Sequence, residues 1–300
     1  MYGRPLSHEM PTVTNWNNRF ADFVSRKQSA AISARLPGYL TVGSAGDTSR
    51  LEMVTSDWSA SLFDGPFFES PPPDGPLPSI NTVFVQSADG NTGARNPADL
   101  GGGATDTHLI YEGLSRVRAD AVMTGAATIR GSQMILGVWH PELVRLRAGL
   151  GLPRYPAQIV ATRSGDLAIE SELMFNVPEV PVFVLTTHDG AATLAPRIEG
   201  RPWISIVAEP QESHLIAGLR RLRDGHAIRR ISCIGGRTLA TELIDAGLVQ
   251  DLYLTTSPKP GGEPGTPFYT GTTPLVTTCV VRKTGRDEEA GVLFEHLLLP

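Results

Sequence analysis

The sequence predicts an α/β fold with three layers, in which helices flank a mainly parallel β-sheet and an antiparallel hairpin closes the C-terminal end. The first observation is that short apolar runs alternate with helix-like segments from residue 79 onward. This alternation is typical of β-α-β units, whose parallel strands are covered on both faces. The second is that residues 275–299 hold two apolar runs around a charged turn, the pattern of a hairpin.

The order of the elements follows from the same alternation. We expect strands within residues 80–87, 119–125, 157–165, 181–187, 203–208, 229–236 and 250–258. We expect helices at residues 105–117, 212–225 and 237–247. The last two are expected to close at Gly225 and Gly247, because glycine readily adopts the left-handed conformation that ends a helix.

The N-terminal 70 residues are predicted to be an extension. They hold few apolar positions and so make a weak core of their own. Two alternatives stay open: the extension packs on the main domain, or it is partly disordered. Within it, residues 14–35 favour one amphipathic helix. The apolar face of that helix would carry Trp16, Phe20, Phe23 and Val24.

A proline-rich stretch marks the predicted domain boundary. Residues 70–78 read SPPPDGPLP, with five prolines and one glycine, a composition typical of a stiff, extended linker. We therefore predict a linker at residues 71–78 and the main domain at residues 79–300.

Composition narrows the class of protein. The chain of 300 residues has 41% hydrophobic content, a net charge of −5 and a pI near 5.8, so we expect a globular protein without a nucleic-acid-binding face. No apolar run reaches 18 residues, so no membrane span is expected. Cys233 and Cys279 are the only cysteines; two isolated thiols predict neither a disulfide scaffold nor a cysteine-based zinc site, and they favour a cytoplasmic location without a metal.

Glycines follow the apolar run at residues 231–234 and point to a phosphate site. Gly235 and Gly236 lie between an expected strand and an expected helix, where free backbone N–H groups and the helix dipole favour an anion. Arg237 and Thr238 follow at once, and both side-chain types suit phosphate oxygens.

A second glycine element, GAATIR at residues 125–130, repeats this arrangement with Thr128 and Arg130. The two elements together suit the two ends of a dinucleotide, and an arginine near the adenosine ribose favours NADP over NAD. The G-x-G-x-x-G and G-x-x-x-x-G-K-[ST] motifs are absent, which excludes a standard Rossmann first turn and a P-loop.

Read in order, VQSADGNTG, RVRADAVMTGAATIR, IVATRSG, ISCIGGRTLATELIDAGLVQDLYLTTSP and the final hairpin resemble one family. It is the reductase domain of bacterial riboflavin biosynthesis, the 5-amino-6-(5-phosphoribosylamino)uracil reductase family, whose fold is like dihydrofolate reductase. The resemblance spans about residues 79–299. It implies NADPH as the hydride donor, a homodimer, and a pyrimidine substrate whose phosphorylated ribosylamino group is reduced to a ribityl chain.

The resemblance also implies roles for individual residues. On the cofactor side it places Ser87, Gly125, Thr128, Gly235, Gly236, Arg237, Thr238 and Leu239. Asp89 and Gly90 match the turn that leads into the loop over the nicotinamide, and Asp89 is the predicted catalytic residue. Arg116 matches an arginine on the substrate side.

Three departures from the family pattern concern the substrate. Ile234 stands where the family usually has an acid before the glycine pair, and Val83 stands where many members have a lysine. The family's D-D-P-x-L-T-x-R segment is replaced by GSQMILGVWHPELVRLR, in which Arg145 or Arg147 is a candidate ligand for a substrate phosphate. No deaminase motif H-x-E or P-C-x-x-C occurs, so at most the reductase half is expected.

With Ile234 and Val83 apolar, the candidates for the proton donor are Asp89, Asp106, His108 and water. A turn aspartate also bonds its own backbone, and Asp106 and His108 also fit a helix N-terminus. Two other functions therefore stay open: an NADPH-dependent reductase of the same fold that acts on dihydrofolate or another pterin, and a non-catalytic relic whose working part is the extension.

Overall fold

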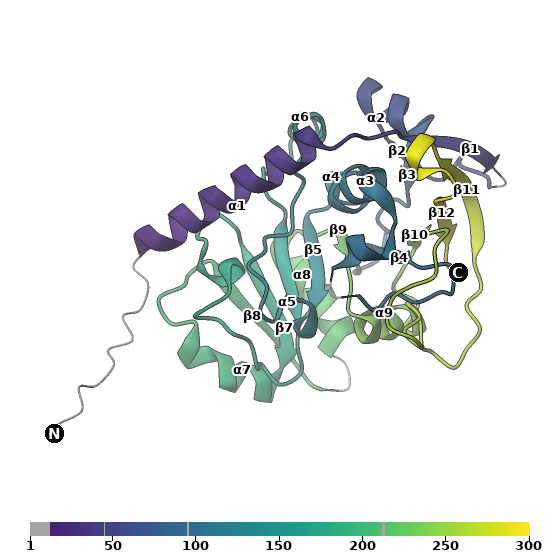
Figure 1. Cartoon of the computed structure of the whole chain (residues 1–300). Helices are drawn as coiled ribbons and strands as arrows, with labels where there is room; N and C mark the ends of the chain where they lie inside the picture. The colour runs from purple at the N-terminus through teal and green to yellow at the C-terminus, as the bar shows by residue number, and fades with distance from the viewer. Residues whose placement is uncertain (1–12, 45, 95, 212–213) are drawn as a thin grey trace.

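The computed structural model describes residues 13–44, 46–94, 96–211 and 214–300, and a ten-stranded β-sheet runs through its centre (Figure 1). The strands of this sheet are β1 (Tyr39–Ser44), β4 (Ser79–Gln86), β5 (Ala121–Gly125), β6 (Ala157–Ala161), β7 (Val182–Thr187), β8 (Ile204–Glu209), β9 (Arg230–Cys233), β10 (Asp251–Thr256), β11 (Thr278–Gly285) and β12 (Leu293–Leu298). Their order in space is β1-β11-β12-β10-β4-β9-β5-β6-β7-β8. A separate ribbon pairs β2 (Glu52–Val54) with β3 (Phe67–Glu69).

The sheet has a parallel part and an antiparallel part. Every neighbouring pair from β10 to β8 is parallel, whereas β12, β11 and β1 continue the sheet in antiparallel pairs. The strands expected from the alternation of apolar runs are all present, and β11 with β12 forms the expected C-terminal hairpin. The predicted fold class is therefore confirmed.

Helices cover both faces of the sheet. The α-helices are α1 (Val13–Ser33), α2 (Asp57–Phe63), α3 (Gly103–Thr105), α4 (Ser115–Val117), α5 (Ala126–Ile129), α6 (Pro141–Gly149), α7 (His188–Leu194), α8 (His214–His226) and α9 (Arg237–Asp245). Short 3-10 turns are η1 (Pro97–Leu100), η3 (Leu173–Asn176), η4 (Ala195–Arg197) and η5 (Asp287–Glu289), and η2 (Asp106–Leu114) is a π-helix.

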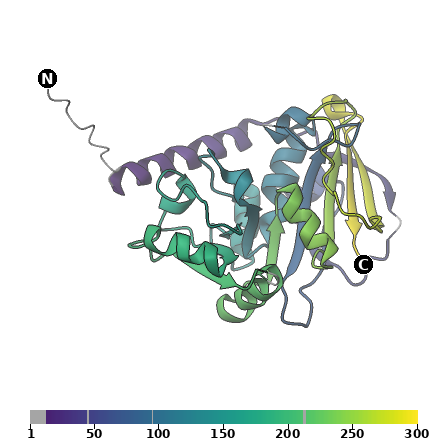
Figure 2. The same cartoon turned by 90° about the horizontal axis from the view of Figure 1, so that it is seen from below.

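Two sets of apolar contacts define the three layers. Side chains of α1 join one cluster with Val122, Val160 and Val184 of the sheet. Side chains of α8 and α9 join another with the neighbouring positions Met123 and Ile159. Successive residues of a strand point to opposite faces, so α1 and the α8–α9 pair lie on opposite sides, as Figure 2 shows.

The helix predicted at residues 212–225 is present as α8, but it ends one residue later than expected. The residue with left-handed backbone there is Ala227, with φ 55°, and not Gly225. Residues 212 and 213 lie outside the described residues. The helix predicted at residues 237–247 ends as expected, with Gly247 at φ 63°.

The N-terminal segment packs on the rest of the chain. Trp16, Phe20 and Phe23 of α1 are at most 8% exposed and join the core cluster that contains Val160 and Phe175. Strand β1 pairs with β11 at the edge of the main sheet. Of the two alternatives for the extension, residues 13–44 and 46–70 therefore follow the first, because they pack on the main domain. The domain boundary at residues 71–78 stays a prediction.

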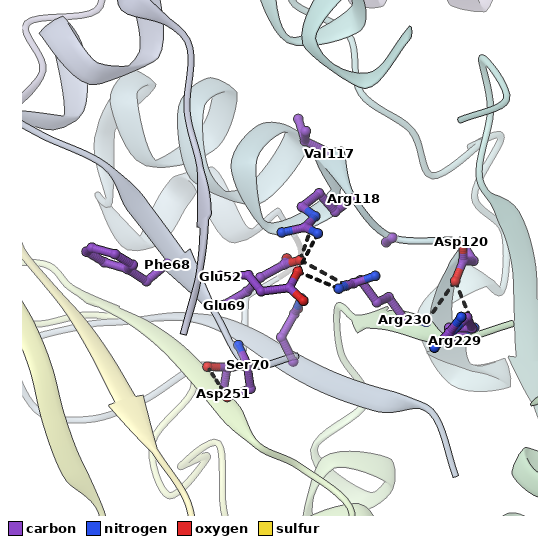
Figure 3. Close-up of polar contacts among 12 residues, drawn as sticks. Glu52, Phe68, Glu69, Ser70, Val117, Arg118, Asp120, Arg229, Arg230 and Asp251 are labelled. Atoms are coloured by element: carbon purple, nitrogen blue, oxygen red, sulfur yellow. Dashed lines mark hydrogen bonds and ion pairs between the residues drawn. The ribbon is translucent and has the colours of Figure 1, made fainter. Parts of the chain in front are cut away.

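Buried ion pairs fix the β2–β3 ribbon to the amino ends of the central strands (Figure 3). The Glu69 carboxylate lies 3.2 Å from Nε of Arg118 and 3.1 Å from Nε of Arg230. Nearby, the backbone N–H of Ser70 donates to Asp251 over 2.9 Å, and Asp251 contacts the buried His296 over 2.7 Å. This network lies at the end of the sheet away from the carboxyl ends of the strands.

Candidate active site

A cleft of about 460 Å³ lies at the carboxyl ends of β5, β6 and β9, the place where parallel α/β sheets bind ligands. The strand order puts these three strands side by side, with β9 next to β5 and β5 next to β6. The residues that line the cleft are Gly125, Ala126, Ala127, Thr128, Ala161, Thr162, Arg163, His214, Leu215, Gly236, Arg237, Thr238, Leu239 and Glu242.

Gly236 lines this cleft, and Gly235 directly precedes it in the chain. Gly235 and Gly236 have φ angles of 140° and 89°, a region that side-chain-bearing residues enter only with strain. The backbone N–H of Gly125 donates to the carbonyl of Gly235 over 3.3 Å. The two glycine elements that the sequence singles out are therefore in contact.

Helix α9 begins at this glycine pair with an open N-terminus. Its N-cap is Gly236, no side chain caps it, and its first turn holds no acid. The first backbone N–H groups of a helix lack partners within the helix, and the helix dipole favours an anion there. The start of α9 is thus built to accept an anionic group from the cleft.

Arginines supply positive charge beside the helix start. Arg237 is half-buried on the cleft and makes no ion pair with any residue that the structure describes. Arg163 lies across the cleft and contacts Glu242 over 2.5 Å. Arg163 and Thr162 follow β6 directly, and the sequence signal that points to them is the strand-to-turn run IVATRSG.

The cleft gathers most of the residues predicted on the cofactor side. Gly125, Thr128, Gly236, Arg237, Thr238 and Leu239 line it, and Gly235 adjoins it through its contact with Gly125. Ser87 does not line the cleft, and its hydroxyl oxygen lies 2.8 Å from the carbonyl oxygen of Gly261. Ser87 therefore ties two loops together in this structure.

Asp89 belongs to the same loop contact. It is exposed, and its carboxylate accepts a hydrogen bond from the Ser87 hydroxyl over 2.5 Å and one from the Gly261 backbone over 3.3 Å. These hydrogen bonds, that of Ser87 first, lower the pKa of Asp89. A carboxyl with a lowered pKa is ionised at neutral pH, so it is a poor proton donor.

A second cavity, of about 190 Å³, lies where β4 ends and η2 begins. It is lined by Lys27, Val85, Asn96, Pro97, Ala98, Gly102, Asp106, Thr107, Tyr111, Glu112, Arg116, Met134, Ile135 and Leu136. The helix predicted at residues 105–117 is present, but its centre is a π-helix that breaks at Gly113, with φ −135° and ψ −110°. Such π segments often occur at functional sites, and this one supplies several polar side chains to the cavity.

Asp106 is the buried acid of the second cavity. It is 5% exposed, and the Thr255 hydroxyl donates to its Oδ1 over 2.5 Å. Burial raises the pKa of Asp106 to about 7, and the charge of Glu289 also raises it, although the Thr255 hydrogen bond opposes the shift. The carboxyl thus carries a proton for part of the time at neutral pH. His108 lines neither cavity and lies 3.6 Å from Glu112.

The three arginines predicted on the substrate side differ in their positions relative to the cavities. Arg116 lines the second cavity and is 1% exposed. Arg147 is buried outside both cavities, and its Nη1 donates to the carbonyls of Arg116, Val117 and Ala119. Arg145 is exposed on α6 and pairs with Glu142. Only Arg116 therefore has the position of a ligand.

Ile234 and Val83 are both buried among apolar side chains. Ile234 is 5% exposed and shares a cluster with Ile135, which lines the second cavity, and with Ala126, which lines the first. Val83 is 3% exposed and packs in a core cluster with Leu109. Neither position offers a charge. Of the side chains that the sequence offers as proton donors, Asp106 is the one that lines the second cavity.

Two features are not found in the part of the chain that the structure describes. No three histidine, cysteine, aspartate or glutamate side chains gather closely enough to hold a metal ion. No helix in this part has the length and apolar character needed to cross a membrane.

Comparison with known proteins agrees with this arrangement. The family model for the RibD C-terminal domain matches residues 78–289, whereas no curated protein matches the chain. A pyrimidine reductase-like protein from Corynebacterium diphtheriae is 18% identical, with a TM-score of 0.57 over 74% of this chain and 92% of that one. The riboflavin biosynthesis reductase Rib7 of Saccharomyces cerevisiae is 15% identical, with a TM-score of 0.53 over 76% and 92%.

A solved structure from Thermotoga maritima shows the same fold. It is a diaminohydroxyphosphoribosylaminopyrimidine deaminase/5-amino-6-(5-phosphoribosylamino)uracil reductase, 17% identical, with a TM-score of 0.53. The match covers 75% of this chain but 57% of that protein. At such identities the likeness is one of fold.

Proposed function

The chain belongs to the RibD C-terminal domain family, and from this premise we propose that it is an NADPH-dependent reductase that converts the ribosyl side chain of a phosphoribosylamino-pyrimidine to a ribityl chain. The observation that carries the proposal is the open N-terminus of α9 behind Gly235 and Gly236, which faces a cleft of about 460 Å³ at the carboxyl ends of the strands. A free helix start at this place in a parallel sheet supports the binding of a dinucleotide pyrophosphate.

The residues of the cleft are suited to the phosphate groups of NADPH. The backbone N–H groups at the start of α9, with Arg237 and Thr238 beside them, would hold the pyrophosphate. Arg163 lies at the β6 side of the cleft, where its guanidinium would favour a cofactor that carries a 2′-phosphate. Bound NADPH would supply a hydride to a carbon of the substrate.

Asp106 is the residue proposed to complete the reaction. When hydride adds to the carbon of an imine or aldehyde, the adjoining nitrogen or oxygen gains the electron pair and needs a proton. Asp106 lines the second cavity, and its pKa of about 7 lets it donate that proton near neutral pH. A positioned acid of this kind raises the rate by roughly 10²–10⁴-fold.

A second candidate keeps the cofactor and changes the substrate. It is favoured by the buried apolar side chains of Ile234 and Val83, since the family's acid and lysine positions are then without charge. A pterin such as dihydrofolate is the alternative substrate to test. Rescue of a riboflavin-requiring, reductase-deficient strain would support the first substrate, and failure to rescue with intact NADPH binding would support the second.

Titration with NADPH tests the cofactor assignment. The nicotinamide fluorescence and the melting temperature of the protein should both change with a Kd in the micromolar range, and NADH should bind more weakly. No binding at millimolar NADPH would contradict the proposal and favour the non-catalytic relic. The homodimer and the cytoplasmic location stay predictions.

A further inference from the structure

Two buried carboxyls meet at the start of the helix that carries Asp106. Helix α3 runs directly into η2, and Asp106 is the first residue of η2. Glu289 of η5 is 7% exposed, and its Oε1 accepts a hydrogen bond from the backbone N–H of Thr105 over 3.0 Å. A carboxylate that accepts an N–H from the first turn of a helix is favoured in its charged form. Glu289 therefore brings a negative charge to the residue that precedes Asp106.

Two glycines leave the space for these carboxyls. A Cβ added at Gly103 would lie 2.5 Å from both Cδ and Oε1 of Glu289. A Cβ added at Gly102 would lie 3.0 Å from Oδ2 of Asp106. Glycine is the residue that permits such a close approach of the backbone. Gly102 and Gly103 thus allow Glu289 to reach the helix start beside Asp106.

The N-terminal extension also contacts this helix start. The backbone N–H of Gly38 donates to the Thr105 hydroxyl over 3.2 Å. The Gly38 carbonyl accepts from the backbone N–H of Arg286, which directly precedes η5, over 3.0 Å. Tyr39 follows in β1, is fully buried and shares an apolar cluster with Leu109 of η2. The extension therefore joins the start of η2 to the segment that carries Glu289.

The phenol of Tyr39 lies near both carboxyls. Burial raises the pKa of Tyr39 well above its ordinary value, and the charges of Asp106 and Glu289 act in the same direction. The centre of its ring lies 6.1 Å from that of Phe63 and 5.8 Å from that of Phe294. Tyr39 and these aromatic neighbours therefore keep water from this side of the two acids.

Glu289 supplies a negative charge that acts on Asp106. Burial is the main cause of the raised pKa of Asp106, and the charge of Glu289 adds to it. The titratable and charged side chains that line the second cavity or adjoin Asp106 are Tyr39, Tyr111, Glu112, Glu289, Arg116 and Lys27. Of the two other acids, Glu112 pairs with Lys27 over 2.5 Å, whereas Oε2 of Glu289 has no hydrogen-bond partner among the described residues. Because like charges in one buried site favour protonation of one group, Asp106 keeps its proton while Glu289 is charged.

We propose that Glu289 and Tyr39 are positioning residues for Asp106, so that η5 and the N-terminal extension both contribute to the active site. Glu289 fixes the backbone before Asp106 through Thr105, and its charge keeps the proton on Asp106 until the substrate takes it. Tyr39 keeps water away from both acids. These roles rest on the proposed function, in which Asp106 gives its proton to the substrate.

Infrared titration of the full chain measures the protonation of Asp106 without a substrate. The C=O stretch of the protonated carboxyl is obtained by subtracting, for each protein, the spectrum of the same protein with Asp106→Asn. We expect a midpoint near pH 7 in the parent. The midpoint should lie about one pH unit lower in Glu289→Gln, whose neutral amide oxygen can still accept from Thr105.

Tyr39 is tested in the same titration. Tyr39→Ala should lower the midpoint of Asp106, because water that enters beside a carboxyl favours its charged form. Tyr39→Phe keeps the ring and should restore the midpoint of the parent. Tyr39→Leu replaces Tyr39→Ala if urea unfolding shows that the latter does not fold, and its midpoint should fall in the same direction.

Kinetics with the proposed substrate gives a second measurement. Since the protonated form donates, Glu289→Gln should keep the kcat/KM of the parent at pH 5 within about twofold and lose about tenfold at pH 8. A purely structural role would lower kcat/KM equally at both pH values. Glu288→Gln is the matched control, because Glu288 is the neighbour of Glu289 on η5 and its side chain is 46% exposed. It should leave both the midpoint and kcat/KM as in the parent.

The two measurements separate this inference from the proposed function. Reduction of the proposed substrate with a midpoint that Glu289→Gln leaves unchanged, or that Glu288→Gln lowers equally, would overturn the role of Glu289 and leave the proposed function standing. An unchanged midpoint in Tyr39→Ala would overturn the role of Tyr39. A lowered midpoint in Glu289→Gln without reduction of the proposed substrate by the parent would support the coupling of the two acids while the proposed function fails.

Discussion

The substitution Gly236→Ala tests the role of the glycine pair directly. Gly236 has φ 89° and ψ 98°, and its N–H belongs to the first free donors of α9. A Cβ added there would lie 3.5 Å from Leu239 Cβ and 3.6 Å from the Gly125 backbone nitrogen. These are ordinary contacts, so the empty protein can hold the methyl group, and the main penalty in stability comes from the positive φ.

Two separate magnitudes follow. The positive φ should lower the free energy of unfolding by about 1–3 kcal/mol. The methyl group should also keep a pyrophosphate from approaching the start of α9, with the loss of one hydrogen bond to a charged group at about 1.5–3 kcal/mol. Each 1.4 kcal/mol is a factor of ten, so the Kd for NADPH should rise about 10- to 100-fold.

Gly247→Ala is the matched control, because Gly247 follows the other end of α9 with φ 63° and nothing lies within 4 Å of its added Cβ. Fluorescence titration gives the NADPH affinity, and urea unfolding gives the stability of both variants. We expect similar losses of stability and a loss of affinity in Gly236→Ala alone. Unchanged NADPH affinity in Gly236→Ala, or an equal loss in Gly247→Ala, would refute the placement of the pyrophosphate.

Three further predictions concern the acid, the 2′-phosphate and the buried network. Because the pKa of Asp106 is about 7 and the protonated form donates, kcat/KM for the proposed substrate should fall tenfold for each pH unit above pH 7. Asp106→Asn should lower kcat/KM roughly 10²–10⁴-fold and remove this decrease at high pH. A pH profile that is the same in Asp106→Asn and the parent would exclude Asp106 as the proton donor. A raised pKa in the folded state also means that the contribution of Asp106 to stability is lost as pH rises from about 4 to about 7, so urea unfolding of Asp106→Asn should vary less with pH over that interval. Arg163→Gln should weaken NADPH about 10-fold and NADH less than twofold, and equal effects on both titrations would contradict the 2′-phosphate contact. Glu69→Ala leaves Glu52 as the remaining carboxylate of Arg118 and Arg230 and should lower the free energy of unfolding by about 1.5–3 kcal/mol with unchanged NADPH affinity. The exposed Glu142→Ala should lower it by less than about 1 kcal/mol.

The main sheet could be read from the sequence because its strands are buried on both faces and appear as continuous apolar runs. Strand β1 left no such signal, since only Tyr39 of its six residues is buried. The β2 and β3 strands have three residues each, too few for a pattern of alternation. The sequence predicts an ordinary helix at residues 105–117 and does not predict the π-helix η2 or its break at Gly113.

The sequence predicts the cofactor side of the site because the residues that form it lie close together in the chain. A strand, two glycines and a helix follow one another within residues 230–245, and backbone conformation alone makes that segment an anion site. The substrate side depends on long-range contacts. Asp106 gains its environment from Thr255, 149 positions away, and Glu112 meets Lys27 across 85 positions. From the sequence alone, Asp106 is one candidate for the proton donor beside Asp89, His108 and water.

A crystal structure of the protein with NADPH would test the central claim most directly. The account predicts the pyrophosphate within hydrogen-bond distance of the backbone N–H groups at the start of α9, beside Arg237, with the nicotinamide directed along the sheet edge toward the cavity that holds Asp106. Cofactor bound elsewhere, or an empty cleft at millimolar NADPH, would contradict it.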